Sequence, residues 1–259
     1  MTIILTNDDG IHSLGLQSLA HNLAEEYDVV VVAPDREQSA VGHAITLSNP
    51  LRITEISNSN GIPTYSCNGT PADAVKLGLK VILNDPPDLL ISGINNGANV
   101  GASLIYSGTV SAATEGILLG IPSIAVSLDN RLGGDYSAAI KFTSFIARKI
   151  IQNGLPKGIL LNINVPDLPL DKIKGAKIAV QGRTNFNDFF EKRRDPRGQT
   201  YYWMAGSMVV DDSHPDHDVS ALNDGYITIT PVNYDLTARK FLPKLKNWGL
   251  EKNWEDDVF

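Results

Sequence analysis

The sequence predicts an α/β fold built on a doubly wound, mostly parallel, Rossmann-like sheet. Residues 2–6 and 28–34 are short apolar segments, and between them apolar side chains recur with helical spacing over residues 16–23. A strand, a helix and a second strand within about thirty residues are typical of a parallel unit. Both strand segments are apolar at nearly every position, so we expect helices on both faces of the sheet. The first helix is expected to run to about Tyr27.

The next segments continue this alternation of strands and helices. Thr70 is a good N-cap residue and Pro71 suits the first turn, which predicts a helix that begins there. Gly120 is placed to end a later helix. Up to residue 165 the sequence indicates a hairpin within 51–67, a helix from Thr70, a strand at 89–92, a helix from Val110 to Gly120, a strand at 121–128, a helix at 137–151 and a strand at 158–165.

The composition changes at Thr184, where aromatic residues and a run of mixed charges replace the α/β pattern. Exposed aromatics and arginines on a projecting hairpin are typical of a subunit contact. We therefore expect an α/β core at residues 1–183, completed by 225–235, and an oligomerisation arm at 184–224. Residues 236–259 are expected to form a C-terminal helical tail that is interrupted at Pro243.

The overall composition narrows the classes of partner. The chain has 259 residues, 42% of them hydrophobic, which is enough for a substantial core. Its formal net charge of −7 argues against a nucleic-acid polymer as the main partner. Cys67 is the single cysteine, which excludes an intrachain disulfide or a cysteine-rich zinc site. The N-terminus already has a strand pattern and no apolar stretch reaches membrane length, so we expect a cytoplasmic protein without membrane contact.

Polar side chains follow the predicted strands at the points where the strands end. Asp8 and Asp9 come directly after the first strand, and two adjacent ionised carboxylates repel each other unless a cation lies between them. Further oxygen ligands follow later strands, and such a set favours a hard cation, Mg²⁺ or Mn²⁺, over structural zinc. A turn-capping role is the alternative for any single asparagine. The later ligands are Ser39, Asn95, Asn96 and Asn99.

A second polar segment precedes the helix expected from Val110. Ser107, Gly108 and Thr109 are small residues at its start, where free backbone amides and the helix dipole favour a phosphate group. No lysine or arginine lies in these segments, so phosphate binding would depend on neutral donors and on the cation.

Several of these segments resemble the signature motifs of the survival protein SurE family of metal-dependent nucleotidases. The resemblance covers roughly residues 1–130, with a weaker match at 218–232, and implies that Asp8, Asp9, Ser39 and Asn95 hold one divalent metal ion per subunit. The segments are Asn7-Asp8-Asp9-Gly10, Ser39-Ala40-Val41-Gly42, Asn68-Gly69-Thr70-Pro71, Ser92-Gly93-Ile94-Asn95-Asn96-Gly97-Ala98-Asn99 and Gly108-Thr109-Val110-Ser111-Ala112-Ala113.

The resemblance also implies an activity and further site residues. The expected reaction is hydrolysis of nucleoside 5′-monophosphates, also of 3′-monophosphates and of short polyphosphate, by a homodimer or homotetramer. Asn99 and Ser107 match further active-site residues, so we expect them to be catalytic together with Asp8 and Asp9. The residues expected to contact substrate or phosphate are Ser39, Gly42, Asn96, Gly108 and Thr109.

Three other readings compete with this one. A dinucleotide-dependent oxidoreductase would share the first strand and helix, but the turn at Asn7-Asp8-Asp9-Gly10 lacks the G-x-G-x-x-G spacing. An aspartyl-phosphate phosphatase usually separates its two acids by one residue, and a trapped phosphoenzyme would favour it. A nucleotide-binding module would bind ligand without metal-dependent turnover. For His43, a loop hydrogen bond and a catalytic role are both open.

Overall fold

The computed structural model describes residues 1–57, 61–130, 134–210 and 214–251. Parts of three expected elements lie outside these residues: 58–60 in the hairpin, 211–213 in the arm and 252–259 in the tail. The strands are β1 (Thr2–Thr6), β2 (Asp28–Pro34), β3 (Ile53–Glu55), β4 (Thr64–Cys67), β5 (Leu89–Asn96), β6 (Ser123–Asp129), β7 (Ile159–Pro166), β8 (Ala176–Ile178), β9 (Thr184–Arg194), β10 (Thr200–Val210) and β11 (Ile227–Asn233). The α-helices are α1 (Leu14–Leu23), α2 (Pro71–Leu77), α3 (Gly108–Leu118), α4 (Ser137–Asn153), α5 (Asp218–Asn223) and α6 (Leu242–Lys246).

The central sheet confirms the predicted fold class. Within the described residues it has nine strands in the order β3-β4-β2-β1-β5-β6-β7-β11-β8. The strands from β4 to β7 run parallel, while β3 and β11 each pair antiparallel with their inner neighbour. The chain leaves β1 toward β2 on one side and later returns to β5 on the other side. This reversal of strand order places a cleft at the carboxyl ends of β1 and β5.

Helices cover both faces of the sheet, as the apolar strands predict. Ile3 and Leu5 pack with α1 and α4, whereas Ile4 between them packs with α2 and α3 on the opposite face. All three side chains are fully buried. Alternate residues of one strand therefore supply two separate cores, which fix the strand and the polar residues that follow it.

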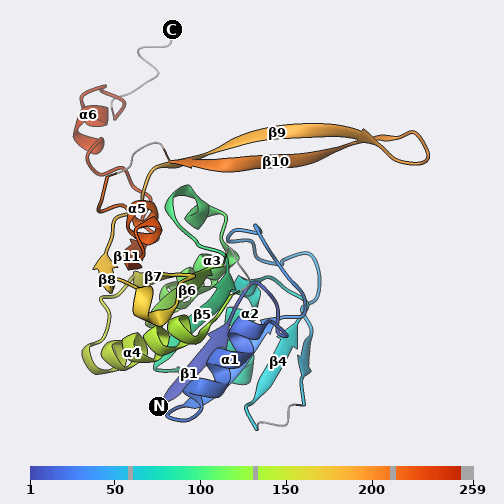
Figure 1. Cartoon of the computed structure of the whole chain (residues 1–259), viewed down its shortest axis with the longest axis vertical. Coiled ribbons are helices and arrows are strands. Elements are labelled where there is room, and N and C mark those ends of the chain that lie inside the picture. The colour runs from blue at the N-terminus through green and yellow to red at the C-terminus, as the bar shows by residue number, and fades with distance from the viewer. Residues whose placement is uncertain (58–60, 131–133, 211–213, 252–259) are drawn as a thin grey trace.

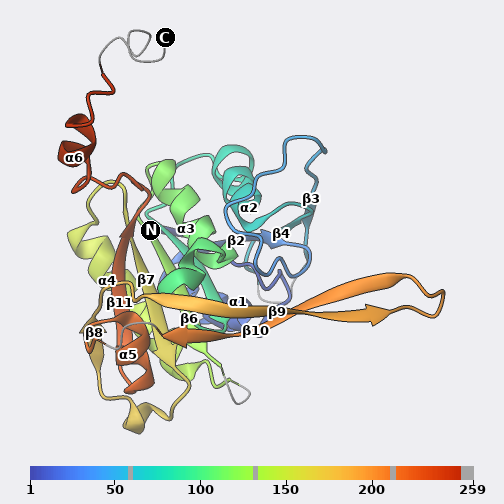
Figure 2. The same cartoon turned by 90° about the horizontal axis from the view of Figure 1, so that it is seen from above.

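The hairpin of β9 and β10 projects far beyond the sheet (Figures 1 and 2). Its strands pair antiparallel from Thr184 opposite Val210 to Arg194 opposite Thr200. This confirms the predicted projecting hairpin. The residues of α5 fall in the segment 184–224 that we expected to form the arm, but this helix packs against β7 and β11.

Some element boundaries differ from the expected ones. Helix α1 ends at Leu23 rather than near Tyr27, because turns follow directly after it. Pro243 lies in the first turn of the short helix α6 and does not interrupt it. A backbone N–H in the first turn has no partner within the helix, so a proline there costs no helical hydrogen bond. Strand β5 extends to Asn96 past a register shift between Ser92 and Asn95. In the described part of the chain, none of the helices has the length and apolarity needed to span a bilayer.

Candidate active site

A cavity of about 780 Å³ opens at the carboxyl ends of β1 and β5, where the strand order reverses. Seven residues expected at the site line it together: Asp8, Asp9, Ser39, Asn95, Asn96, Asn99 and Ser107. Gly42, Gly108 and Thr109 are not among its lining residues. The carboxyl ends of parallel strands share one edge of the sheet, which explains why distant segments of sequence meet here.

Asp8 is held deep in the cavity by the start of α3. Thr109 Oγ1 donates to Asp8 Oδ1 at 2.5 Å, and the Asp8 carbonyl accepts from the Gln38 amide at 2.7 Å. Gly108 is required beside it, because a Cβ at this position would lie 2.7 Å from Asp8 Cβ. Burial raises the pKa of Asp8, although the Thr109 hydroxyl and the amides of Gly108 and Thr109 oppose this. Thr109 and Gly108 thus do not line the cavity themselves, but they fix the position of the Asp8 side chain that does.

Asp9 carries a negative charge that its surroundings disfavour. Its Oδ2 accepts from the Asn96 backbone amide at 2.9 Å, which orients the carboxylate. Burial raises the pKa of Asp9 to about 6 against this hydrogen bond, and the neighbouring charges of Asp8 and Glu37 raise it further. A cation placed between the two aspartates would lower both pKa values and remove this electrostatic cost.

Ser39 and Asn95 add neutral oxygens beside the aspartates. Asn95 Nδ2 donates to the Gly97 carbonyl at 2.7 Å, which leaves the Oδ1 end of the amide for a cation. The Ser39 hydroxyl donates to the Glu37 carboxylate, and its lone pairs stay available. Nowhere in the described ranges do three Asp, Glu, His or Cys side chains gather as a metal cluster. Two carboxylates with neutral oxygens suit Mg²⁺ or Mn²⁺, which retain water and substrate oxygens as ligands.

Asn99 is fixed by a buried network that the sequence analysis did not identify. Its amide N–H donates to Asn164 Oδ1 at 2.7 Å, and its carbonyl accepts from Asn162 Nδ2 at 2.8 Å and Asn164 Nδ2 at 3.0 Å. Its side-chain Nδ2 donates to Ser127 Oγ at 2.9 Å. The signal was present in the sequence, because Asn162 and Asn164 are polar residues in an otherwise apolar strand. Buried amides of this kind need partners and so hold the loop that they contact.

Ser107 is the N-cap residue of α3. Its hydroxyl oxygen accepts from the Val110 amide at 3.0 Å, which leaves the hydroxyl hydrogen free to donate into the cavity. The side chain is 6% exposed, so water competes weakly for that hydrogen. This geometry suits a donor to a phosphoryl oxygen.

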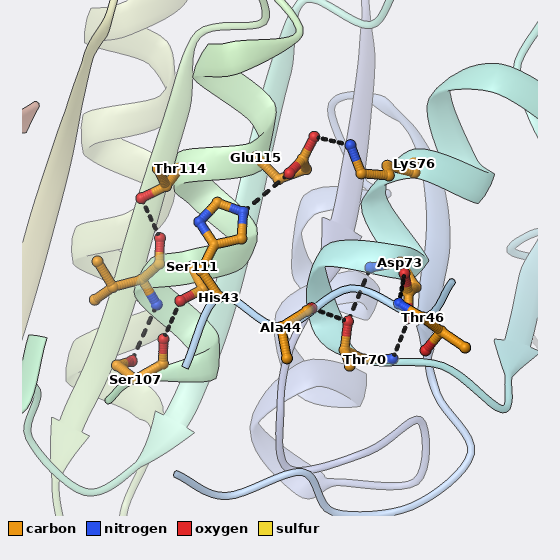
Figure 3. A network of polar contacts seen from close by, with 11 residues as sticks. His43, Ala44, Thr46, Thr70, Asp73, Lys76, Ser107, Ser111, Thr114 and Glu115 are labelled. Atoms are coloured by element: carbon orange, nitrogen blue, oxygen red, sulfur yellow. Dashed lines mark hydrogen bonds and ion pairs between the residues drawn. The ribbon is translucent and has the colours of Figure 1, made fainter. Parts of the chain in front are cut away.

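The loop that carries Ser39 is anchored on α2 and α3 (Figure 3). His43 Nε2 lies 2.9 Å from Glu115 Oε2, and Lys76 Nζ lies 2.5 Å from the other carboxylate oxygen. Burial raises the pKa of Glu115, but the hydrogen bonds from His43 and Lys76 outweigh it and keep the pKa below its usual value. His43 therefore makes a loop hydrogen bond and is not among the cavity-lining residues.

Further contacts fix the same loop. Thr70 Oγ1 donates to the Ala44 carbonyl at 2.7 Å, and the Thr46 amide donates to Asp73 Oδ1 at 3.0 Å (Figure 3). The Gly42 amide donates to the Tyr106 carbonyl at 3.0 Å. The start of α2 is closed by a capping box between Thr70 and Asp73.

The arm also reaches the cavity. Phe186 and Asp188 of β9 and Met204 of β10 are among the lining residues. Glu37 is another unpredicted lining residue, from the loop after β2. The arm and the strand ends are far apart in sequence, and the local sequence pattern does not indicate that they line one cavity.

Comparison with known proteins places this arrangement in a family. The family model described as survival protein SurE matches residues 3–188. A protein named 5′-nucleotidase SurE from Desulfatibacillum aliphaticivorans is 50% identical over 97% of this chain and 100% of its own length. Another with the same name, from Syntrophobacter fumaroxidans, is 46% identical over 96% of this chain and 100% of its own. The crystal structure of the SurE protein from Aquifex aeolicus has a TM-score of 0.83 and 40% identity, covering 96% of this chain and 100% of that one. The chain belongs to the survival protein SurE family.

Proposed function

We propose that this protein is a metal-dependent phosphomonoesterase that hydrolyses nucleoside 5′-monophosphates to nucleoside and phosphate. Relatives over nearly the whole chain carry the name 5′-nucleotidase. The observation that carries the proposal is the pair of adjacent carboxylates, buried Asp8 and half-buried Asp9, at the strand ends of a cavity large enough for a nucleotide. We extend the proposal to 3′-monophosphates and short polyphosphate, which present the same terminal phosphoryl group.

Asp8, Asp9, Ser39 and Asn95 are the residues that would hold one Mg²⁺ or Mn²⁺ ion per subunit. All four line the cavity with oxygen atoms, and the raised pKa values of the two aspartates are the cost that a cation would relieve. When bound, such an ion neutralises phosphoryl charge and lowers the pKa of a coordinated water.

The remaining stabilisation of the phosphoryl group comes from neutral donors of the chain. Of the described residues that line the cavity, none is a lysine or an arginine. The Ser107 hydroxyl can donate to a phosphoryl oxygen, and Asn99 Nδ2 has a second hydrogen beyond the one given to Ser127. Donors that are fixed before substrate binds need no reorganisation during the reaction, which is why their loss affects kcat.

The other expected substrate contacts act mainly by positioning. Gly108 and Thr109 hold Asp8, and the Asn96 amide holds Asp9. Gly42 fixes the loop that carries Ser39 through its bond to Tyr106. In this proposal a substitution at one of these positions weakens cation binding directly, and it weakens phosphate binding only as a consequence.

We also propose a homodimer or homotetramer that assembles through the arm. Large apolar side chains are exposed on both of its strands, and a patch of this kind on a projecting element is typical of a subunit contact. They include Phe190, Tyr202 and Trp203, each between 57% and 64% exposed. We place the protein in the cytoplasm, where its proposed substrates occur.

Phosphate release from three substrates tests the proposal. The purified protein with Mn²⁺ is given a nucleoside 5′-monophosphate, its 3′ isomer and tripolyphosphate, and the same set is repeated with excess EDTA. We expect release from all three, fastest from the 5′-monophosphate, and none with EDTA. Phosphate release that EDTA does not reduce would contradict the metal dependence, and inactivity on every nucleotide would contradict the proposed reaction.

A further inference from the structure

One face of the arm is turned toward the cavity. Phe186 and Asp188 lie two positions apart on β9, so their side chains share a face of the hairpin. Phe186 pairs with Met208, which places Met204 of β10 on that same face. Phe186, Asp188 and Met204 all line the cavity, whereas Phe189 of the opposite face does not. The alternation of the strand thus divides the arm into a cavity face and an outer face.

The root of the arm is fixed to the loop that precedes Ser107. The Ala102 amide donates to Thr184 Oγ1 at 2.8 Å, and the Thr184 side chain is buried. Asp218, also buried, accepts from the Gly101 amide at 3.0 Å and from the Gly182 amide at 2.9 Å. The first cavity-lining residue of the arm follows Thr184 by only two positions. These hydrogen bonds therefore hold Phe186 beside the cavity.

The two sides of the cavity differ in chemistry. The strand ends supply carboxylates, amides and hydroxyls, while the arm supplies a phenyl ring, a thioether and the single carboxylate of Asp188. Phe186 is 54% exposed and Met204 is 66% exposed, so both leave a large apolar surface unburied. A nucleoside monophosphate has the same division, with a charged phosphate at one end and a flat aromatic base at the other. Aromatic side chains bind bases of any type by stacking.

We propose that Phe186 and Met204 form the subsite for the base of the nucleotide. This inference rests on the proposed nucleotidase function and assigns the base to the arm and the phosphate to the strand ends. Asp188 lies on the same face, and its negative charge repels a phosphate from the arm side. The subsite contacts only the flat apolar face of the base and therefore accepts purines and pyrimidines alike.

Two tyrosines also line the cavity and are the competing platforms for the base. Tyr136 is partly buried, and this burial together with the charge of Asp9 raises its pKa. Tyr106 is 61% exposed and directly precedes Ser107, so its ring is the stronger competitor. The choice between Phe186 and Tyr106 can be made by experiment.

Binding of adenosine, which has no phosphate, tests the subsite directly. Calorimetry measures its dissociation constant for the wild type, Phe186→Ala, Met204→Ala and the control Phe189→Ala. Loss of a stacking ring weakens base binding by about 5- to 100-fold, which we expect for Phe186→Ala. Phe189→Ala removes an equally exposed ring from the outer face and should bind adenosine like the wild type. Light scattering on both variants controls for a change of assembly.

Kinetics separate this inference from the proposed function. Phe186→Ala should raise KM for adenosine 5′-monophosphate at least fivefold and leave turnover of ribose 5-phosphate, which has no base, unchanged. Unchanged adenosine binding in Phe186→Ala overturns the subsite, as does a loss found in Tyr106→Ala instead. A wild type that hydrolyses neither phosphate ester contradicts the proposed function, while the adenosine measurement still decides the subsite.

Discussion

Replacing Asp9 by asparagine should stabilise the metal-free protein. The carboxylate lies beside Asp8 and Glu37, and burial together with these charges raises its pKa to about 6. Asparagine keeps the shape of the side chain and an oxygen that can accept from the Asn96 amide. The substitution therefore removes the unfavourable charge and retains the hydrogen bond.

The size and pH dependence of the effect follow from this pKa. Between the usual value of 3.8 and about 6, the folded state binds more protons at Asp9 than the unfolded state does. The free energy of unfolding therefore falls as pH rises through this window and stays low above it. The shift is worth at most about 3 kcal/mol, and partial exposure reduces this to about 1–2 kcal/mol at pH 8. For a chain of this length the Tm should rise by about 2–8 °C.

Thermal unfolding by circular dichroism in EDTA measures the effect. At pH 8 Asp9→Asn should melt above the wild type, and at pH 4 the two should melt within about a degree because Asp9 is then protonated. Saturating Mn²⁺ should reverse the order at pH 8, since it stabilises only a protein that binds it. A variant that melts at or below the wild type at pH 8 without metal would refute the reasoning.

Asp73→Asn is the matched control of opposite sign. Burial raises the pKa of Asp73, but hydrogen bonds from Thr46 and Thr70 outweigh it and hold the pKa below its usual value. Its ionised form stabilises the fold above the usual pKa, and this contribution is lost as pH falls through the lowered value. Asp73→Asn should therefore lower the Tm at pH 8, with or without Mn²⁺.

Three further predictions concern the site and the arm. Asn99→Ala should lower kcat on the order of 10²-fold with little change in calorimetric Mn²⁺ affinity. Asn95→Ala should weaken Mn²⁺ binding itself, and equal losses of affinity in the two variants would contradict this division of roles. Gly108→Ala should abolish most activity, because its Cβ would lie 2.8 Å from Asp8 Oδ2, and a crystal structure with Asp8 unmoved would argue against the cause. Deleting residues 185–207 should reduce the number of subunits per particle measured by light scattering and leave Mn²⁺ affinity unchanged; an unchanged number of subunits would count against an oligomerisation arm.

Sequence patterns were sufficient for the elements that bring the strand-end residues together. The apolar runs before Asp8 and before Asn95 predict parallel buried strands, and the carboxyl ends of such strands share one edge of the sheet. The hydroxyl at Ser107 also follows from its place before a helix. These inferences depend on local periodicity and on general rules of α/β topology, so they need no knowledge of long-range contacts.

Other features depend on contacts between segments far apart in sequence. Asn162 and Asn164 hold Asn99 across more than sixty residues, and nothing in their local pattern names that partner. The turn of the arm toward the cavity is set by the bonds of Thr184 and Asp218 to the loop at 101–102. From sequence alone, the aromatic residues of the arm indicated a projecting hairpin that makes a subunit contact.

Phosphate release from adenosine 5′-monophosphate, measured while Mn²⁺ is added to metal-free protein, tests the central claim most directly. We expect no release in EDTA, a rise that saturates as Mn²⁺ is added, and no rise for Asp8→Asn, which should remain folded by circular dichroism. Equal rates with and without Mn²⁺ in the wild type, or full activity of Asp8→Asn at saturating Mn²⁺, would contradict a cation held by the two aspartates.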